Sequence, residues 1–458
     1  MADKFHKLEG VKFPVGSQTA QEIKSLCARY ASHKKKVAFK LKQYTEAALA
    51  HENNPDDTSA RKLAKKLANQ YRFSFRGRLI AVITENKKLD WGKRRSLSQC
   101  FSLAKNLTAH KQSDEAVRVA FKPKANGGQR PVQDFGLQQR ATQELAKTII
   151  ERRVHPQKRQ YTFLGVPKAI RFLKHLDPAA EMWTAKLDIE DFYGHFNDTD
   201  LGKLTWEVPK SVVKATLLSK GNVLMDYEGV PLAGSSLLEA HRGVAQGSIV
   251  SPLLGVLAIS KMDWSPGQKI ECVNYADDFL LVAHTKSELE DAVLAFDLAI
   301  KTRLPGGSFH LKPASISKFG HGIEFLGHNL IVEKDGLKVD PCNAAIERLA
   351  QRLDELSARA RKSIASYQEE MSEPKRERML GRLAALLAYA DGWRASFSEC
   401  EEIDLDAYYG TAMDVFHELC SEAGVTTEEV KSNAPIPSKF HGTNSEFDEL
   451  FVTSDLYQ

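Results

Sequence analysis

Cysteine pairs and long apolar runs are both scarce in this sequence. Its 458 residues include six cysteines, at positions 27, 100, 272, 342, 400 and 420, and no two have CxxC spacing. This argues against a zinc site or a disulfide framework and favours a reducing, cytoplasmic setting. No apolar run approaches the ~20 residues that cross a bilayer, and the opening MADKFHKLEG has no apolar segment after a basic one. We therefore expect neither a secretory signal nor a membrane partner.

Charge is nearly balanced overall but unevenly distributed. The formal net charge is +5, yet residues 1–160 carry 34 Lys and Arg against 14 Asp and Glu, and the remainder carries 30 against 45. This asymmetry indicates one region that faces a polyanion rather than a generally basic protein. Solvated helix faces would produce the same asymmetry, so charge alone does not decide between the two interpretations.

The basic N-terminal region has helical periodicity. Residues 18–50 repeat apolar positions at helical spacing, the polar NNPDD (53–57) predicts a loop, and SARKLAKKLANQYRF (59–73) predicts a second helix. The second segment interleaves basic residues with aromatics, which suits phosphate contacts combined with base stacking. The simpler alternative is a solvated basic face above a buried aromatic stripe.

Further along the chain, strand patterns alternate with helices. Residues 116–135 alternate around NGG and predict a β-hairpin, and a helix is expected over 138–154. MWTAKLDIEDFYGHF (182–196) predicts a strand that breaks near Gly194. ECVNYADDFLLVAHT (271–285) predicts a hairpin with an acidic tip. From about residue 342 the pattern is amphipathic and helical, and 431–458 has little periodicity.

Two of these strands carry isolated acids, Asp188 and the adjacent Asp277 and Asp278. Unpaired carboxylates in apolar strands are costly. They are tolerated if each is satisfied structurally, or if they meet and bind a divalent cation such as Mg²⁺, which prefers oxygen ligands. Two such ions can activate a hydroxyl and stabilise a leaving phosphate oxygen.

The order of several short blocks resembles a known family. LDIEDFY, GVAQGSIVSPLLG and YADDF look like motifs A, B and C of the reverse transcriptase palm. KPKANGGQRPV, YTFLGVPKAIRFLK and EFLGH are similar to its fingers hairpin, the following block and the primer grip. The resemblance covers residues 116–330. It implies an α+β right-hand polymerase with fingers and palm built on antiparallel sheet, a helical thumb and a basic helical N-terminal extension.

The resemblance also implies a division of the chain. The expected regions are a basic, mainly helical RNA-binding region (1–110), fingers and palm (111–335), a helical thumb (336–430) and an extended or flexible tail (431–458).

Metal-ligand roles transfer by position within the motifs. Asp188, Asp277 and Asp278 would be the catalytic, metal-binding acids, with Asp278 contributing least, and the backbone carbonyl of Ile189 would also face a metal. Two Mg²⁺ ions are implied, with Mn²⁺ as a substitute.

Nucleotide-binding roles follow from the same motifs. Tyr193 matches the steric gate that excludes a ribose 2′-hydroxyl, with simple packing as the alternative. Gln246 would contact nucleotide and template, and Gly247 would permit close backbone approach. Lys124 and Arg130 would pair with the triphosphate, Lys122 being a competing residue. A solvent-exposed basic hairpin is the alternative for these cations.

Motif D departs from the family. HLKPASIS (310–317) places Ser315 where many bacterial relatives have a lysine thought to protonate pyrophosphate. Lys312 or Lys318 could substitute, so the general acid stays open.

The finer subgroup rests on a short segment. Ala276 and the compact motif B fit bacterial branches, and DGWRASFS (391–398) looks similar to unclassified and defence-associated bacterial reverse transcriptases. This implies RNA-directed DNA synthesis from dNTPs on a non-coding RNA template in anti-phage defence.

Two alternatives to this function stay open. One is a retron-type enzyme making RNA-linked DNA, and the other is a polymerase-fold RNA-binding protein with weak or template-independent synthesis. Homo-oligomerisation and the priming group, for which Tyr457 and Ser454 are available hydroxyls, are also open.

Overall fold

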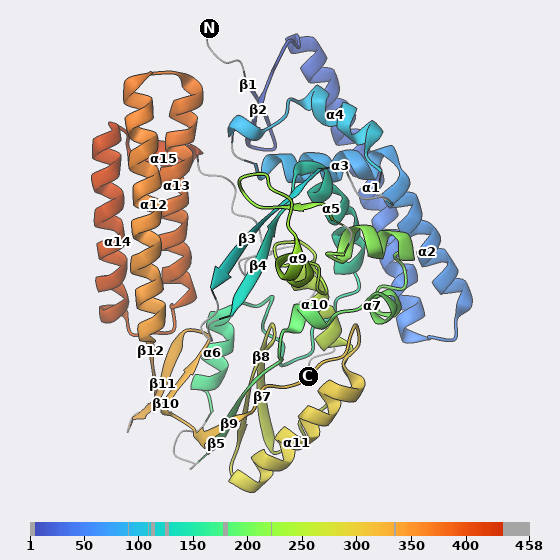
Figure 1. Ribbon diagram of the computed structural model, residues 1–458, viewed down its shortest axis with the longest axis vertical. Coiled ribbons are helices and arrows are strands. Elements are labelled where there is room, and N and C mark those ends of the chain that lie inside the picture. Colours follow the sequence, from blue (N-terminus) through green and yellow to red (C-terminus); the bar gives the residue numbers. More distant parts are fainter. Residues whose placement is uncertain are drawn as a thin grey trace.

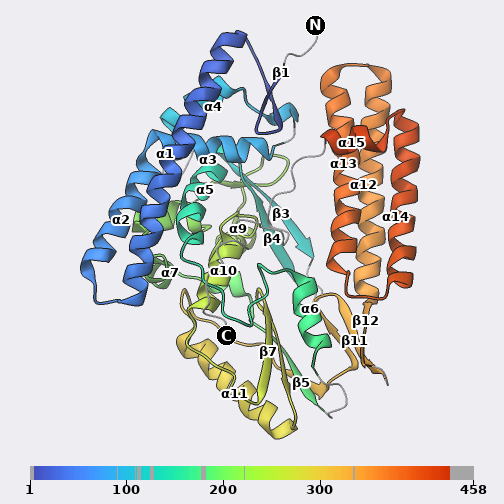
Figure 2. The ribbon, with the colours of Figure 1, turned by 180° about the vertical axis from the view of Figure 1, so that it is seen from behind.

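The computed structural model places the N-terminal helices on one side of the molecule and the C-terminal helices on the other. Figures 1 and 2 show the β3–β4 hairpin between them and the main sheet at the opposite end from the N-terminus. The structure describes residues 5–89, 91–108, 110, 115–123, 128–176, 182–220, 222–333 and 336–433. The predicted tail beyond residue 433 lies outside this range. No helix among the described residues is both long and apolar enough to cross a membrane.

The N-terminal part is a β-hairpin followed by helices, which confirms the two helices predicted there. Its elements are β1 (Phe5–Leu8), β2 (Val11–Pro14), α1 (Ala20–Asn53), α2 (Thr58–Phe73), α3 (Phe75–Lys87), the 3₁₀ turn η1 (Trp91–Lys93) and α4 (Leu97–Asn106). Thr19 starts α1 with a capping box to Glu22, which satisfies two backbone N–H groups that a helix start leaves unpaired.

The segment predicted to form fingers and palm follows. Their elements are β3 (Val117–Pro123), β4 (Gln129–Asp134), α5 (Leu137–Glu151), α6 (Val166–Lys174), β5 (Trp183–Asp188), η2 (Phe192–His195), α7 (Asp198–Leu204), α8 (Lys210–Val212), the π-helical turn η3 (Val213–Leu217), β6 (Leu224–Met225), α9 (Gly234–Ala240), α10 (Ser251–Ser260), β7 (Ile270–Tyr275), β8 (Asp278–Ala283), α11 (Lys286–Arg303) and β9 (Ser315–Lys318). Both predicted hairpins, β3–β4 and β7–β8, are confirmed. The predicted strand at 182–196 ends at Asp188, earlier than the expected break near Gly194, because Asp191 turns the chain with a positive φ of 41°.

The palm sheet has the order β7-β8-β5-β9, and its strand β8 is buried on both faces from Phe279 to Ala283. Phe279 and Leu281 of β8 point into one core with Phe296 of α11. The alternate residues Leu280 and Val282 join a second core with the thumb. Each fully buried side chain of this size contributes roughly 1.5–3 kcal/mol to folding, so the strand that carries the acidic tip is held from two sides.

The C-terminal part pairs a small sheet with a helical bundle. Its elements are β10 (His321–Phe325), β11 (His328–Glu333), β12 (Gly336–Pro341), α12 (Asn343–Glu369), α13 (Glu373–Ser396), α14 (Glu402–Ala423) and α15 (Thr427–Asn433). An ion pair between Lys12 of β2 and Glu377 of α13 joins the N-terminal hairpin to this bundle.

The cores do not follow the predicted regions at two places. Helix α5 contributes Leu137 and Leu145 to the core of the N-terminal helices, although it follows the β3–β4 hairpin. The predicted division at 335 falls between β11 and β12, which pair with each other throughout. The four-part division by function stays a prediction.

Candidate active site

Strand register brings two of the three predicted acids opposite each other, and the third lies in the adjoining turn. Strand β5 pairs with β8 so that Asp188 lies directly opposite Asp278. Tyr275 pairs with Asp278 across the hairpin, which leaves Ala276 and Asp277 as its turn. Residues directly opposite in an antiparallel pair have Cβ atoms ~5 Å apart, so the sheet itself brings the acids together.

Two polar residues that the sequence did not single out, the half-buried Thr162 and the buried Asn274, hold the acidic turn. Ala276 has a positive φ of 54°, an uncommon conformation for a residue with a side chain. Its N–H donates to Thr162 Oγ1 at 2.7 Å, and Asn274 Nδ2 donates to the Ala276 carbonyl at 2.8 Å. Asn274 is 2% exposed. A polar residue inside an apolar strand is the one sequence signal that could have identified this brace.

The electrostatics of the turn favour a cation. Burial raises the pKa of Asp277, and Asp188 raises it further. Burial and the neighbouring Asp277 raise the pKa of Asp278 to about 6. These carboxylates are therefore destabilised as anions in the protein alone, which a bound divalent cation would reverse.

The side chain of Lys312 compensates part of this negative charge. Its Nζ lies 2.5 Å from Asp188 Oδ2, and its backbone N–H donates to the Asp188 carbonyl. An antiparallel β-bridge between Ile189 and Leu311 places the two segments side by side. The two backbone hydrogen bonds of this bridge are accepted by the carbonyls of Asp188 and His310, so neither of them uses the Ile189 carbonyl. Of the two lysines considered for motif D, Lys312 lies at the acids, whereas Lys318 pairs with Trp183 at the far end of β5.

Ser315, at the position of the family lysine, lies in β9 opposite Lys186. Position 315 itself therefore carries a hydroxyl rather than a basic side chain, although Lys186 is its partner on β5.

Tyr193 lies beside the acidic turn. Burial raises the pKa of its hydroxyl, and so does the charge of Asp277, while Arg130 lowers it. A Cβ at Gly255 of α10 would lie 3.5 Å from the Tyr193 hydroxyl and 2.9 Å from the Phe192 ring. The helix therefore packs closely against this aromatic pair.

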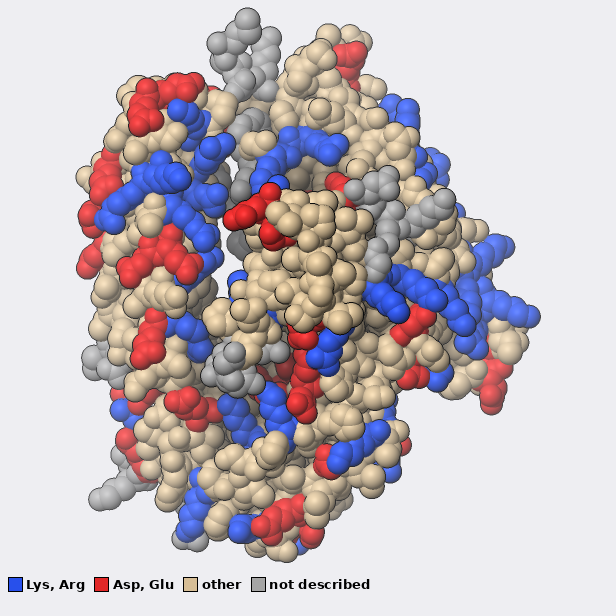
Figure 3. All heavy atoms as spheres, viewed as in Figure 1, with Lys and Arg blue, Asp and Glu red and all other residues tan. Residues whose placement is uncertain are grey.

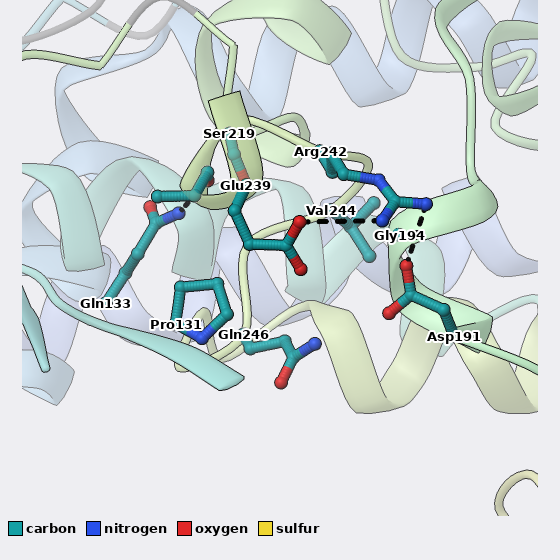
Figure 4. Close-up of a pocket in the computed structure, with 10 residues that line it drawn as sticks. Pro131, Gln133, Asp191, Gly194, Ser219, Glu239, Arg242, Val244 and Gln246 are labelled. Carbon is teal, nitrogen blue, oxygen red and sulfur yellow. Dashed lines mark hydrogen bonds and ion pairs between the residues drawn. The ribbon is translucent and has the colours of Figure 1, made fainter. Parts of the chain in front are cut away.

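The motif B loop is fastened to the fingers on one side. The N–H of Gln133 in β4 donates to the Gln246 carbonyl at 2.7 Å. Gly247 has φ +105°, and a Cβ there would lie 2.1 Å from the Gln133 carbonyl oxygen. Only glycine fits this position without moving the fingers strand. Gln246 lines a small hollow of about 10 Å³ together with Asp191 and Arg242 (Figure 4).

The basic fingers hairpin reaches the same centre. Lys122 and Arg130 are register partners on β3 and β4, and both are exposed. Arg130 is close enough to act on the pKa of Asp277 and of Tyr193. Lys124 lies outside the described residues.

The sequence also matches a family model. Residues 122–330 match the model described as reverse transcriptase (RNA-dependent DNA polymerase). The chain contains a reverse transcriptase domain. This is the domain of an RNA-directed DNA polymerase, a nucleotidyltransferase, and its right-hand architecture agrees with the palm sheet and helical thumb described above. All predicted site residues of the reverse transcriptase lie inside the matched segment.

Two solved structures are similar to the chain at low identity. An apo telomerase from Candida tropicalis, truncated from its C-terminal domain, shares 13% identity over 54% of this chain and 61% of that one, with a TM-score of 0.32. A telomerase from Candida albicans, in complex with a TWJ fragment of telomeric RNA, shares 12% identity over 75% of this chain and 65% of that one, with a TM-score of 0.33. The chain thus spans less than two thirds of either telomerase, and a likeness at these TM-scores carries no functional information. No curated protein matches the chain in sequence.

The donor set of this candidate site, three carboxylates, fits a hard divalent cation. In the described part of the chain, no three His, Cys, Asp or Glu side chains are grouped closely enough to hold a metal ion as they stand. Asp188 is engaged by Lys312 instead. Carboxylate oxygens with pKa values raised by burial and by one another are nevertheless the ligands that Mg²⁺ prefers.

Proposed function

We propose that the protein synthesises DNA on an RNA template, with Asp188, Asp277 and Asp278 as its catalytic acids. The observation that carries this proposal is the register of β5 and β8, which sets Asp188 opposite Asp278 beside a braced acidic turn. The same acids and the Ile189 carbonyl would hold two Mg²⁺ ions, or Mn²⁺ in their place. When bound, such ions activate an attacking hydroxyl and stabilise the leaving phosphate oxygen. Asp188, which now pairs with Lys312, would have to release that lysine to hold a cation.

We propose that the substrates are dNTPs. The ring of Tyr193 would fill the space of a ribose 2′-hydroxyl, and Gln246 and Gly247 would form the facing wall. Arg130 supplies the planar donor fork that suits a triphosphate, and Lys124 would be its partner. The position of Arg130 near Asp277 and Tyr193 supports this assignment.

The N-terminal helices have a surface that suits a structured RNA template. Figure 3 shows Lys and Arg gathered over the α1–α2 side of the molecule. Phe39 and Phe73 are 65% and 44% exposed, whereas Tyr71 is buried. Lys40 donates to Gln70 across the two helices at 3.1 Å, so each exposed aromatic lies within one helical turn of the same contact. Exposed aromatics among cations suit base stacking beside phosphate contacts.

We propose that this activity serves bacterial anti-phage defence in the cytoplasm, on a cellular non-coding RNA. The support is the resemblance of DGWRASFS to defence-associated enzymes. Trp393 and Phe397 of that segment pack with tilted rings whose centroids are 4.7 Å apart in the thumb core, where Phe397 also contacts His328 of β11. The segment therefore has a structural task that ties the thumb to the small sheet. Retron-type synthesis stays an alternative, which a covalent RNA–DNA product would reveal.

A weakly catalytic RNA-binding protein is favoured by one observation, the Lys312–Asp188 ion pair, which occupies a carboxylate oxygen that a metal would need. Primer extension decides between this function and polymerisation. On an RNA template with a DNA primer and dNTPs, we expect extension that stops with a chelator and returns with Mg²⁺ or Mn²⁺. Tight RNA binding without extension under either ion would contradict the polymerase proposal.

A further inference from the structure

An ion-pair cluster outside the acidic turn lies beside the proposed sugar-selecting residue. Asp191, three residues after Asp188, adopts a left-handed conformation with φ 41° and ψ 46°. Its carboxylate lies over Gly194, where an added Cβ would come within 2.1 Å of Asp191 Oδ2. This oxygen is shielded from solvent and has no hydrogen-bond partner among the described residues. A buried carboxylate oxygen without a hydrogen bond is costly, so the group facing it matters.

Arg242 is the charge that faces this oxygen. Its guanidinium approaches Asp191 Oδ2 at 3.0 Å as an ion pair without hydrogen-bond alignment, and it also approaches Glu239 of α9 at 3.5 Å. Figure 4 shows the guanidinium between the two carboxylates, at the edge of the hollow that Gln246 lines. The Asp191 side chain is 18% exposed, and that of Arg242 is 47% exposed.

The backbone that follows Arg242 is fastened to Tyr193. A Cβ at Gly243 would lie 2.0 Å from the Tyr193 carbonyl oxygen, so the backbones of these two segments are in direct contact. The N–H of Val244 donates to that same carbonyl at 3.0 Å. The turn that carries Tyr193 is therefore attached to the motif B loop twice, through Asp191–Arg242 and through Tyr193–Val244.

We infer that Arg242 is a positioning residue that sets the discrimination between deoxyribo- and ribonucleotides by holding the turn of Tyr193. This inference rests on the proposed gate role of Tyr193. Asp191 precedes the gate by two residues, so release of its carboxylate frees one side of the turn. The exclusion of a single hydroxyl by an aromatic ring depends on the exact position of that ring. A displacement of about 1 Å can lower the rate of a reaction by up to ~10²-fold.

The test compares single-nucleotide incorporation of dATP and ATP in Arg242→Gln, Asp191→Asn and Arg242→Lys. Asn tolerates the left-handed conformation as well as Asp does, so Asp191→Asn removes the ion pair without adding backbone strain. We expect Arg242→Gln and Asp191→Asn to lower the ratio of kcat/KM for dATP over ATP by roughly tenfold. Arg242→Lys should recover part of that ratio because it keeps the charge.

The control is Lys214→Gln, which removes an exposed ion pair to Asp198 near the same turn and should leave the ratio unchanged. A double variant with Tyr193→Ala separates positioning from general damage. If Arg242 acts through Tyr193, the double variant discriminates no worse than Tyr193→Ala alone. The melting temperature of each variant identifies any that fail to fold, and equilibrium affinities for dATP and ATP measure discrimination in binding without catalysis.

The outcomes are distinguishable. Relaxed discrimination in Tyr193→Ala with an unchanged ratio in both Arg242→Gln and Asp191→Asn would overturn the positioning role and leave the gate standing. An unchanged ratio in Tyr193→Ala would overturn the gate and the inference together. Additive losses in the double variant would show that Arg242 acts independently of Tyr193, which also contradicts the inference.

Discussion

The β7–β8 hairpin and the α1–α2 surface each concentrate charge of one sign, but they handle it in opposite ways. In the hairpin, two carboxylates are half-buried beside a third, and the pKa of Asp278 rises to about 6. On α1 and α2, lysines such as Lys35 and Lys66 are exposed to water. Burial makes the hairpin charges costly unless a ligand compensates them, whereas exposure makes the lysines almost free of such cost.

Burial decides how strongly a charged side chain indicates function. A buried acid pair without enough cations demands an explanation, and cation binding supplies one. Exposed lysines demand none, so the N-terminal assignment depends on the exposed Phe39 and Phe73 rather than on charge.

We expect the largest loss of activity from a substitution in the β7–β8 hairpin. Asp277→Asn keeps the volume of the side chain but removes a proposed cation ligand. We expect DNA synthesis on RNA to fall on the order of 10³-fold or more, as when a preorganised electrostatic group is removed. Primer extension measures this, with Asp297→Asn as the matched control, because that acid forms only a surface i,i+4 pair with Lys301. Activity within tenfold of the parent would remove Asp277 from the catalytic group.

The buried His328 makes the stability of the fold depend on pH. His328 is fully buried, and burial lowers its pKa from 6.5 to about 4. Its Nδ1 lies 3.1 Å from the Leu326 carbonyl oxygen, which makes it the donor and leaves Nε2 without a partner in the described structure. The unfolded chain therefore binds a proton more readily than the fold does, so stability falls as pH is lowered through this window.

We expect about 3 kcal/mol of unfolding free energy to be lost through His328 between about pH 7 and about pH 4. Urea unfolding across this range measures the loss. His328→Asn should flatten the dependence, and the exposed His321→Asn should not. Equal pH profiles for the two variants would contradict the burial argument.

Backbone fit in the motif B loop predicts an intermediate effect. Gly247→Ala places a methyl group against the Gln133 carbonyl oxygen at a positive φ. We expect kcat/KM for dNTPs to fall roughly tenfold because strain of about 1–3 kcal/mol is shared between the loop and β4. Gly267→Ala is the control, since its φ is also positive but nothing lies within 4 Å of the added carbon. Equal losses of activity in both would assign the effect to the glycine conformation alone.

The exposed surface should give the smallest effect per residue. Replacing Lys35 and Lys66 by Gln should weaken RNA binding a few-fold and reduce the salt slope of log K by about 0.7 for each lost phosphate contact. Phe39→Ala should weaken binding to unpaired RNA more than to duplex RNA, since stacking contributes about 1–3 kcal/mol per base. Fluorescence anisotropy over a salt series measures both. Unchanged slopes and affinities would indicate a merely solvated surface.

The sequence predicted the elements and the acids because both depend on local pattern and motif order. Runs of β-forming residues on either side of the acidic tip predicted the β7–β8 hairpin, and the order of the motif blocks grouped Asp188 with its acids. The Lys312–Asp188 and Arg242–Asp191 pairs were not predicted, since they join segments distant in the chain and leave no periodic trace. The aromatic stripe of 59–73 proved mixed, with Tyr71 buried and Phe73 exposed, because helical spacing does not state which face a neighbouring helix covers.

The most direct measurement of RNA-templated synthesis at these acids is sequencing of nucleic acid co-purified from cells. It compares the native protein with an Asp277→Ala/Asp278→Ala variant, before and after DNase or RNase. We expect the same RNA with both proteins and DNA complementary to that RNA only with the native one. RNA with both proteins and complementary DNA with neither, or DNA of equal amount with both, would contradict it.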